Sequence, residues 1–105
     1  MSTSSTATVF AALGDETRLR IVSRLSQGPA SITKLTGDFS VTRQAVSKHL
    51  RVMEQAGLVR SSRHGRESLY QLDRRRLDET RSYLELISKE WDNALERLRT
   101  LIEDQ

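Results

Sequence analysis

A chain of 105 residues is long enough for one domain with a small hydrophobic core and too short for two. It has no cysteine, which excludes disulfides, thiol nucleophiles and thiolate metal sites, and no run approaches the ~18 apolar residues of a membrane-spanning helix. The net charge of +3 is uneven: residues 42–76 hold nine Lys or Arg and three Asp or Glu, whereas the rest carries −3. Such clustering is typical of a polyanion-binding surface, although a basic run is often only a solvated surface.

The N-terminal stretch MSTSSTATV lacks the basic and apolar regions of a secretory signal, which favours a cytoplasmic protein with no membrane partner. Its small polar residues predict a flexible arm over residues 1–8. A short helix is expected over residues 9–13, where VFAAL is apolar, and Gly14 should end it.

Two further helices are predicted from their capping residues. Asp15 can accept a hydrogen bond from a free N–H of a first turn, so a second helix should begin here and end near Gly28. Ser31 predicts a short third helix in the same way, and that helix should stop near Gly37. The hydrophobic core expected from these helices and the next comprises Leu19, Val22, Leu25, Leu35, Val46, Leu50 and Met53.

A fourth helix over residues 42–56, capped by Thr42, has two unlike sides. Its apolar positions fall on one side at about 100° per residue, and Arg, Lys, Gln and Ser fall on the other. A short helix, a turn with apolar Phe39 and Val41, and a helix with a basic, amide-rich outer side form the helix-turn-helix layout. Arg and Lys donate to guanine, Gln pairs with adenine, and Ser reaches bases or phosphates. The DNA-binding residues predicted here are Thr42, Arg43, Gln44, Ser47, Lys48 and Arg51.

A β-hairpin is predicted directly after this helix. Residues 58–62 and 67–72 are its expected arms, joined by a tight turn at Gly65, where glycine allows a positive φ. Three basic residues surround the tip as candidates for contacts with phosphates or a minor groove: Arg63, His64 and Arg66. A helix-turn-helix followed by a basic-tipped hairpin is a winged helix. The sequence therefore predicts a mostly α-helical fold of about five helices that binds double-stranded DNA.

Together these segments resemble the ArsR/SmtB family of small bacterial winged-helix repressors. The resemblance covers nearly all of residues 9–102 and rests on FAALGDETRLRIVSRL, on TRQAVSKHLRVMEQAGLV and on RSSRHGRESLYQL. It implies a homodimeric transcriptional repressor that recognises an inverted repeat, often near its own gene. Residues 42–56 would then be the recognition helix and residues 63–66 the tip of the wing.

The metal-sensing members of that family place cysteines in the helix before the turn, or histidine and acidic ligands on the C-terminal helix. The helix before the turn reads SITKLTGDF here, without cysteine. His49 and His64 are expected in the core and on the hairpin tip, so they form no pair for a metal, and His49 is interpreted as a hydrogen-bonded core residue. An acidic C-terminal helix without histidine would hold a hard cation only weakly. We therefore expect no metal and no other cofactor, and an inducer stays unidentified.

The C-terminal segment repeats apolar residues every seven positions, in two interleaved series that begin at Leu77 and Thr80. This is the a/d seam of a coiled coil. The seam could pack on its own domain, but a helix of ~28 residues spans ~42 Å, more than so small a domain can cover. Part of it should therefore meet a second copy of the chain. The expected dimer interface comprises Val9, Phe10, Leu13, Leu77, Leu84, Ile87, Trp91 and Leu98.

The predicted organisation is a flexible arm (residues 1–8), a winged helix-turn-helix domain (9–76) and a dimerisation helix (77–105). No nucleophile motif, phosphate-binding glycine loop or pair of carboxylates indicates an enzyme. The alternative function is a winged helix that docks on an acidic partner protein. The Arg, Gln and Ser side chains of the fourth helix argue against it, because amides and hydroxyls beside arginine suit bases better than carboxylates.

Overall fold

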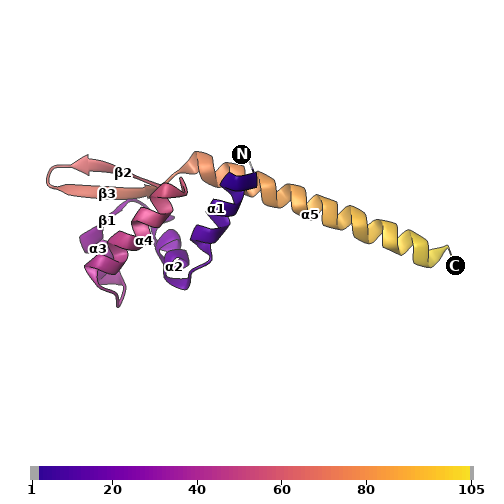
Figure 1. Cartoon of the computed structure of the whole chain (residues 1–105), viewed down its shortest axis with the longest axis horizontal. Helices are drawn as coiled ribbons and strands as arrows, with labels where there is room; N and C mark the ends of the chain where they lie inside the picture. Colours follow the sequence, from indigo (N-terminus) through magenta and orange to yellow (C-terminus); the bar gives the residue numbers. More distant parts are fainter. Residues whose placement is uncertain (1–2, 105) are drawn as a thin grey trace.

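Five helices and a small sheet form the chain in a computed structural model that describes residues 3–104. A body of helices and a hairpin lies at one end, and the last helix leaves it as a single rod (Figure 1), so the molecule measures 69 × 26 × 23 Å. The predicted mostly helical winged helix-turn-helix is confirmed, and no described helix is long and apolar enough to cross a membrane. In order, the elements are α1 (Thr3–Leu13), α2 (Glu16–Leu25), β1 (Ala30–Ser31), α3 (Ile32–Asp38), α4 (Arg43–Gln55), β2 (Val59–His64), β3 (Glu67–Leu72) and α5 (Arg74–Glu103).

The first helix begins earlier than predicted. Residues 3–8 belong to α1 and not to a flexible arm, whereas residues 1–2 of the expected arm lie outside the described residues. Thr6, Val9 and Ala12 are buried at intervals of three residues, which places them on one side of α1. Because two of these three side chains are small or polar, this side carries little hydrophobicity and was not recognisable in the sequence.

The capping residues expected for three helices are confirmed. The Asp15 carboxylate accepts a hydrogen bond from the backbone N–H of Arg18 at 3.0 Å at the start of α2. The hydroxyls of Ser31 and Thr42 accept from the backbone three residues on, each at 3.1 Å, at the starts of α3 and α4. Each cap satisfies one of the N–H groups that a helix leaves free in its first turn. The Thr42 cap thus fixes the point at which the turn between α3 and α4 ends.

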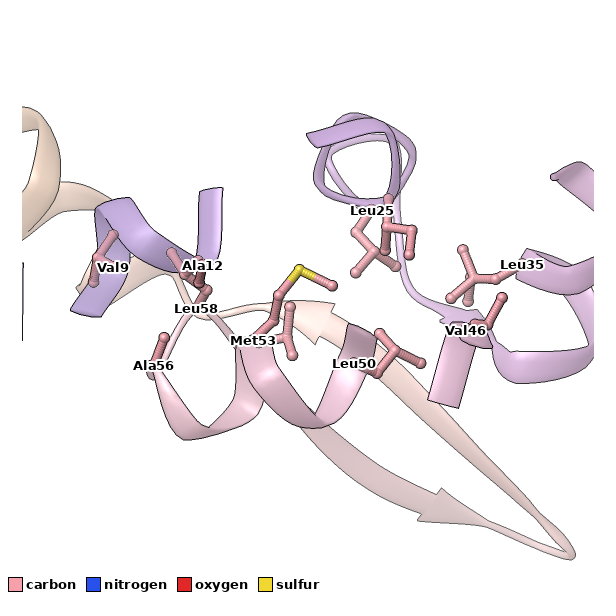
Figure 2. Close-up of a cluster of buried hydrophobic side chains, with 12 residues drawn as sticks. Val9, Ala12, Leu25, Leu35, Val46, Leu50, Met53, Ala56 and Leu58 are labelled. Carbon is pink, nitrogen blue, oxygen red and sulfur yellow. The ribbon is translucent and has the colours of Figure 1, made fainter. Parts of the chain in front are cut away.

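The hydrophobic core lies where the helices meet the base of the sheet, with Met53 of α4 near its centre (Figure 2). Most of the predicted core residues are buried, and Val22 packs at the edge. Leu19 was predicted wrongly: it is 50% exposed, and Ile21 occupies the buried position. Ile21 and Leu25 are four residues apart and share one side of α2, whereas Leu19 lies about 200° around the helix from Ile21. Fully burying a side chain such as Leu50 contributes about 1.5–3 kcal/mol.

The wing is a hairpin with a third strand at its side. β2 and β3 pair antiparallel from Val59 opposite Leu72 to His64 opposite Glu67, so His64 ends a strand and the turn itself contains Gly65, at φ 63°. β1, which the sequence did not predict, pairs with the other edge of β3 and completes a sheet in the order β1-β3-β2. A two-residue strand has no recognisable period, but its pairing ties the segment before α3 to the base of the wing.

The joint at Gly57, just after α4, is where α4, the wing and α5 meet. Gly57 has a φ of 77°, and a Cβ atom added here would lie 2.8 Å from Nε of Arg76, which packs over it from the first turn of α5. The backbone N–H of Asp73 donates to the carbonyl of Leu58 at 2.8 Å and closes the same junction. Three elements with different directions are therefore held at one short joint.

α5 belongs to the body only in its first turns. Leu77 packs against the core, and Thr80 is its one buried residue among those described. Beyond Thr80 every described residue of the helix is exposed except Ala94, which is partly so. α5 therefore leaves the body close to residue 80, a few residues after the boundary predicted between residues 76 and 77.

Candidate DNA-binding surface

α4 presents the polar residues that the sequence placed on its outer side. Val46, Leu50, Met53 and Ala56 are buried, while the predicted DNA-binding residues of α4 are exposed except Ser47, which is partly so. Thr42, at the helix start, is exposed while its oxygen accepts the capping hydrogen bond. The apolar side thus orients α4 on the body and leaves the other side open for a partner.

The outer side chains of α4 have few partners within the chain. Arg43 donates to the hydroxyl of Thr33 on α3 at 2.9 Å. Gln44, Ser47, Lys48 and Arg51 make no side-chain hydrogen bond or ion pair within the part of the chain that the structure describes. Their donors are therefore available to groups outside the protein, and their chemistry suits bases and phosphates.

The tip of the wing carries the three predicted basic residues, all exposed. Nε of Arg63 donates to the carbonyl of Gly65 at 3.2 Å, and the His64 ring lies 3.1 Å from the Ser62 hydroxyl. The Arg66 guanidinium has no hydrogen bond or ion pair in the described part of the chain. The structure places these residues about the same turn and at the far end of the wing from α5 (Figure 1).

An open groove separates α4 from the sheet, and the sequence did not predict it. It is lined by Ser47, Arg51, Glu54 and Gln55 on α4 and by Tyr70 on β3. Burial is the main cause that raises the pKa of the Tyr70 hydroxyl, and the negative charge of Glu54 adds to the effect. Alternation along a strand shows on which face Tyr70 lies but not what lies across from it, so the groove could not be predicted from the sequence.

Comparisons with known proteins agree with this geometry. A family profile described as a helix-turn-helix domain matches residues 13–62. The HTH-type transcriptional regulator Rv2034 of Mycobacterium tuberculosis is 39% identical over 94 residues, which cover 90% of this chain and 85% of that one. The structure of an ArsR-like transcriptional regulator from Rhodococcus sp. RHA1 is 39% identical, covers 93% of this chain and 92% of its own, and superposes with a TM-score of 0.83. This chain belongs to the ArsR/SmtB family.

The ArsR/SmtB chain is therefore a DNA-binding transcriptional regulator and not an enzyme. A more distant structure, a winged helix-turn-helix domain (fragment 1–100) from Mycobacterium bovis that is described as homodimeric, shares the fold. It is 22% identical, covers 83% of this chain and 81% of its own, and superposes with a TM-score of 0.69.

The two histidines of this ArsR/SmtB protein lie far from a common site. His49 is half-buried on α4, 3.4 Å from the Arg18 guanidinium and 4.0 Å from the Asp15 carboxylate. The backbone N–H of Arg18 is the main cause that lowers the pKa of the Asp15 carboxyl. Arg18 also donates to the carbonyl of Ala12, so this cluster joins α1, α2 and α4. Among the described residues, no three His, Cys, Asp or Glu side chains are grouped as a metal site would need.

The residues expected at a dimer interface do not all lie on one free surface. Val9 was placed wrongly, because its side chain is fully buried in the chain's own core. Leu13 and Leu77 pack at the edge of that core, and the Phe10 ring lies 6.3 Å from the Tyr83 ring. Four of the expected interface residues lie farther along α5 and are exposed: Leu84, Ile87, Trp91 and Leu98. Trp91 is 64% exposed.

Proposed function

We propose that this ArsR/SmtB regulator is a homodimeric repressor, acting in the cytoplasm, that binds an inverted repeat in double-stranded DNA. α4 enters the major groove with Arg43, Gln44, Ser47 and Lys48, and the wing contacts the adjacent backbone or minor groove with Arg63, His64 and Arg66. The observation that carries this proposal is the unpaired state of the side-chain donors on α4. Apart from Arg43, those that face outward have no hydrogen-bond or ion-pair partner among residues 3–104. Its own promoter is a natural first target to test.

The apolar residues of α5 support assembly into a dimer. Leu84, Ile87, Trp91 and Leu98 recur at heptad positions on one side of a helix that leaves the body after Thr80. A monomer would leave this stripe in water along most of α5, whereas a second copy would bury it at ~25 cal/mol for each Å² of apolar surface removed. The homodimer described for the winged helix from M. bovis supports the same assembly here.

A two-fold symmetric dimer presents two recognition helices related by rotation. The DNA that fits it has the same symmetry, which is an inverted repeat whose half-sites lie about one helical turn, ~34–36 Å, apart. Phosphate contacts then provide most of the salt-dependent affinity, and base contacts of α4 determine the sequence. No group on the described residues indicates an inducer, which stays an unidentified partner of this proposal.

The second candidate function is docking on an acidic partner protein through the same basic surface. Arginines at the tip of a wing would suit carboxylates too. Gln44 favours DNA, because an amide that donates and accepts side by side matches the edge of adenine and offers a carboxylate only its donor.

The decisive experiment selects bound duplexes from a random pool with the purified full chain and then titrates the enriched sequence at several salt concentrations. We expect an inverted repeat, a complex of two chains with one duplex, and an affinity that falls with a log–log slope near −0.9 for each phosphate neutralised. Equal affinity for a scrambled duplex, or an affinity independent of salt, would contradict the proposal.

A further inference from the structure

The groove between α4 and the sheet contains a hydroxyl that the fold holds firmly. Tyr70 lies on the central strand β3, opposite Ala30 of β1 on one side and Ser61 of β2 on the other. Its ring packs against the core, on the same face of the strand as Leu72, two residues on. The partly buried ring therefore positions the hydroxyl at the rim of the groove, as amphipathic side chains do when an apolar body ends in a polar tip.

This hydroxyl is free to donate a hydrogen bond to a group outside the protein. Tyr70 makes no side-chain hydrogen bond in the described part of the chain, and neither does Arg51, which lines the groove with it. Burial and the charge of Glu54 raise the pKa of Tyr70, so its O–H stays protonated and remains a donor throughout the neutral range. Ser47 adds a second hydroxyl on the α4 side. The two sides of the groove together thus offer a guanidinium and two hydroxyls to a ligand from outside.

The geometry of a duplex determines what would lie there. When a recognition helix occupies the major groove and a wing reaches the adjacent minor groove, one sugar–phosphate strand runs between them. That strand must cross the groove that separates α4 from the sheet. Phosphate oxygens only accept hydrogen bonds, and the unpaired groups that line the groove can donate them.

We propose that Tyr70 is a phosphate-binding residue: its hydroxyl, together with the Arg51 guanidinium, holds the DNA phosphate that lies between recognition helix and wing in each half-site. This inference rests on the proposed function and adds a contact made from the sheet, outside the recognition helix and the wing tip. Because β3 is fixed to the body by strands on both sides, the contact sets the depth and register of α4 in its groove.

Glu54 lines the same groove from α4, and its carboxylate would face the phosphate with a like charge. This carboxylate makes no hydrogen bond or ion pair in the described part of the chain. The phosphate is therefore confined to the part of the groove near Arg51 and Tyr70. Removing the charge of Glu54 should strengthen binding to all sequences by a few-fold, the opposite of what loss of Tyr70 does.

The test compares Tyr70→Phe with Tyr83→Phe on the duplex selected for the wild-type chain. The first change deletes the groove hydroxyl and keeps the ring, and the second deletes an α5 hydroxyl away from the groove. We expect Tyr70→Phe to weaken binding by ~10-fold or more for each half-site, because a hydrogen bond to a charged group is lost. The log–log salt slope should stay the same, since no cation is removed, and an unchanged thermal melt would show that the fold is kept. Tyr83→Phe should bind as the wild type does.

A second readout identifies the phosphate itself. Replacing phosphates one at a time by uncharged methylphosphonates should reveal one position per half-site whose loss weakens the wild type and weakens Tyr70→Phe much less. Wild-type affinity of Tyr70→Phe, or equal losses in both proteins at every methylphosphonate, would overturn the phosphate site while leaving the proposed function in place. If the wild-type chain itself showed no salt-dependent preference for any duplex, the proposed function would fail and this contact with it.

Discussion

The surface formed by α4 and the wing and the surface of α5 are both rich in charge, but the charges have different partners. On α5, ion pairs at intervals of four residues join Arg74 to Asp78, Arg81 to Glu85 and Arg99 to Glu103. On α4 and the wing, Lys48, Arg51 and Arg66 have no ion pair within the described part of the chain. Exposed pairs contribute little to stability, ~0–1 kcal/mol each, so their main effect on α5 is to neutralise its charge locally.

Exposed apolar side chains lie on α5 and not on α4. Leu84, Ile87, Trp91 and Leu98 line α5, whereas the exposed positions of α4 carry polar groups only. A helix with paired charges and an uncovered apolar stripe suits contact with another helix. A helix with unpaired donors suits a polyanion. The two surfaces thus favour different partners, and substitutions in each should have separable effects.

The largest effect is expected on the apolar stripe. Leu84→Asp would place a charge in the seam between two α5 helices, at a cost of several kcal/mol unless the helices separate. The body should stay folded, because its core does not use this residue. We expect a monomer in sedimentation and a collapse of specific DNA binding, since one of the two half-site contacts is lost.

Leu86→Asp is the matched control for this change. Leu86 is 52% exposed and Leu84 is 47% exposed, but Leu86 lies about 160° around the helix from Leu84. The Leu86→Asp variant should remain dimeric and bind DNA normally. If Leu84→Asp also stayed dimeric, α5 would not be the dimer interface, and the roles assigned to the two surfaces would have to be revised.

A smaller effect is expected on α4. Gln44→Ala should cost about 1–3 kcal/mol on the selected duplex and relax the preference at particular base pairs, because its amide reads a base edge. Arg43→Ala should cost a similar amount, although it also removes the hydrogen bond to Thr33. Binding to a panel of single-base variants measures both, with Gln27→Ala, an exposed glutamine outside α4, as the control. An unchanged base preference would mean that α4 only anchors the chain.

The wing should contribute affinity without sequence preference. Arg63→Ala and Arg66→Ala should each weaken binding to all duplexes alike and reduce the log–log salt slope by about one unit. Titrations at several salt concentrations measure this, with Arg97→Ala on α5 as a control of equal charge. A change in base preference instead of slope would make the wing a reader of sequence.

No effect is expected from metals. EDTA or micromolar zinc should leave DNA binding unchanged, because the described residues contain no group of three ligands and the chain has no cysteine. A gel-shift titration with each reagent checks this. Release of DNA by zinc would point to a site assembled from two chains.

Local chemistry made much of the fold predictable. Asp15, Ser31 and Thr42 could be recognised because a side-chain oxygen at a helix start has a specific partner three residues on. The inward-facing and outward-facing residues of α4 could be predicted because apolar and polar residues fall on opposite sides of this helix. The first turns of α1 and the whole of β1 were missed. Thr6 and Ala12 are buried with little hydrophobicity of their own, and a two-residue strand has no period.

The errors in the candidate site have another cause, which is tertiary contact. Val9 looked available for a dimer because its neighbours are apolar too, but the body buries it completely. Tyr70 was not among the predicted site residues, because only the folded chain brings it beside Arg51 and Glu54. Periodicity shows on which side of its helix or strand a residue lies, but it does not show which other element packs against that side.

The joint at Gly57 determines the angle between α4 and α5 in each chain, because Arg76 lies in the space that a side chain at Gly57 would need. In a dimer held along α5, the distance between the two α4 helices depends on this angle. A change of a few degrees would shift both helices away from the spacing of their half-sites, although every group proposed to touch DNA would be intact. A residue without a side chain would in this way set the half-site spacing that the dimer can bind.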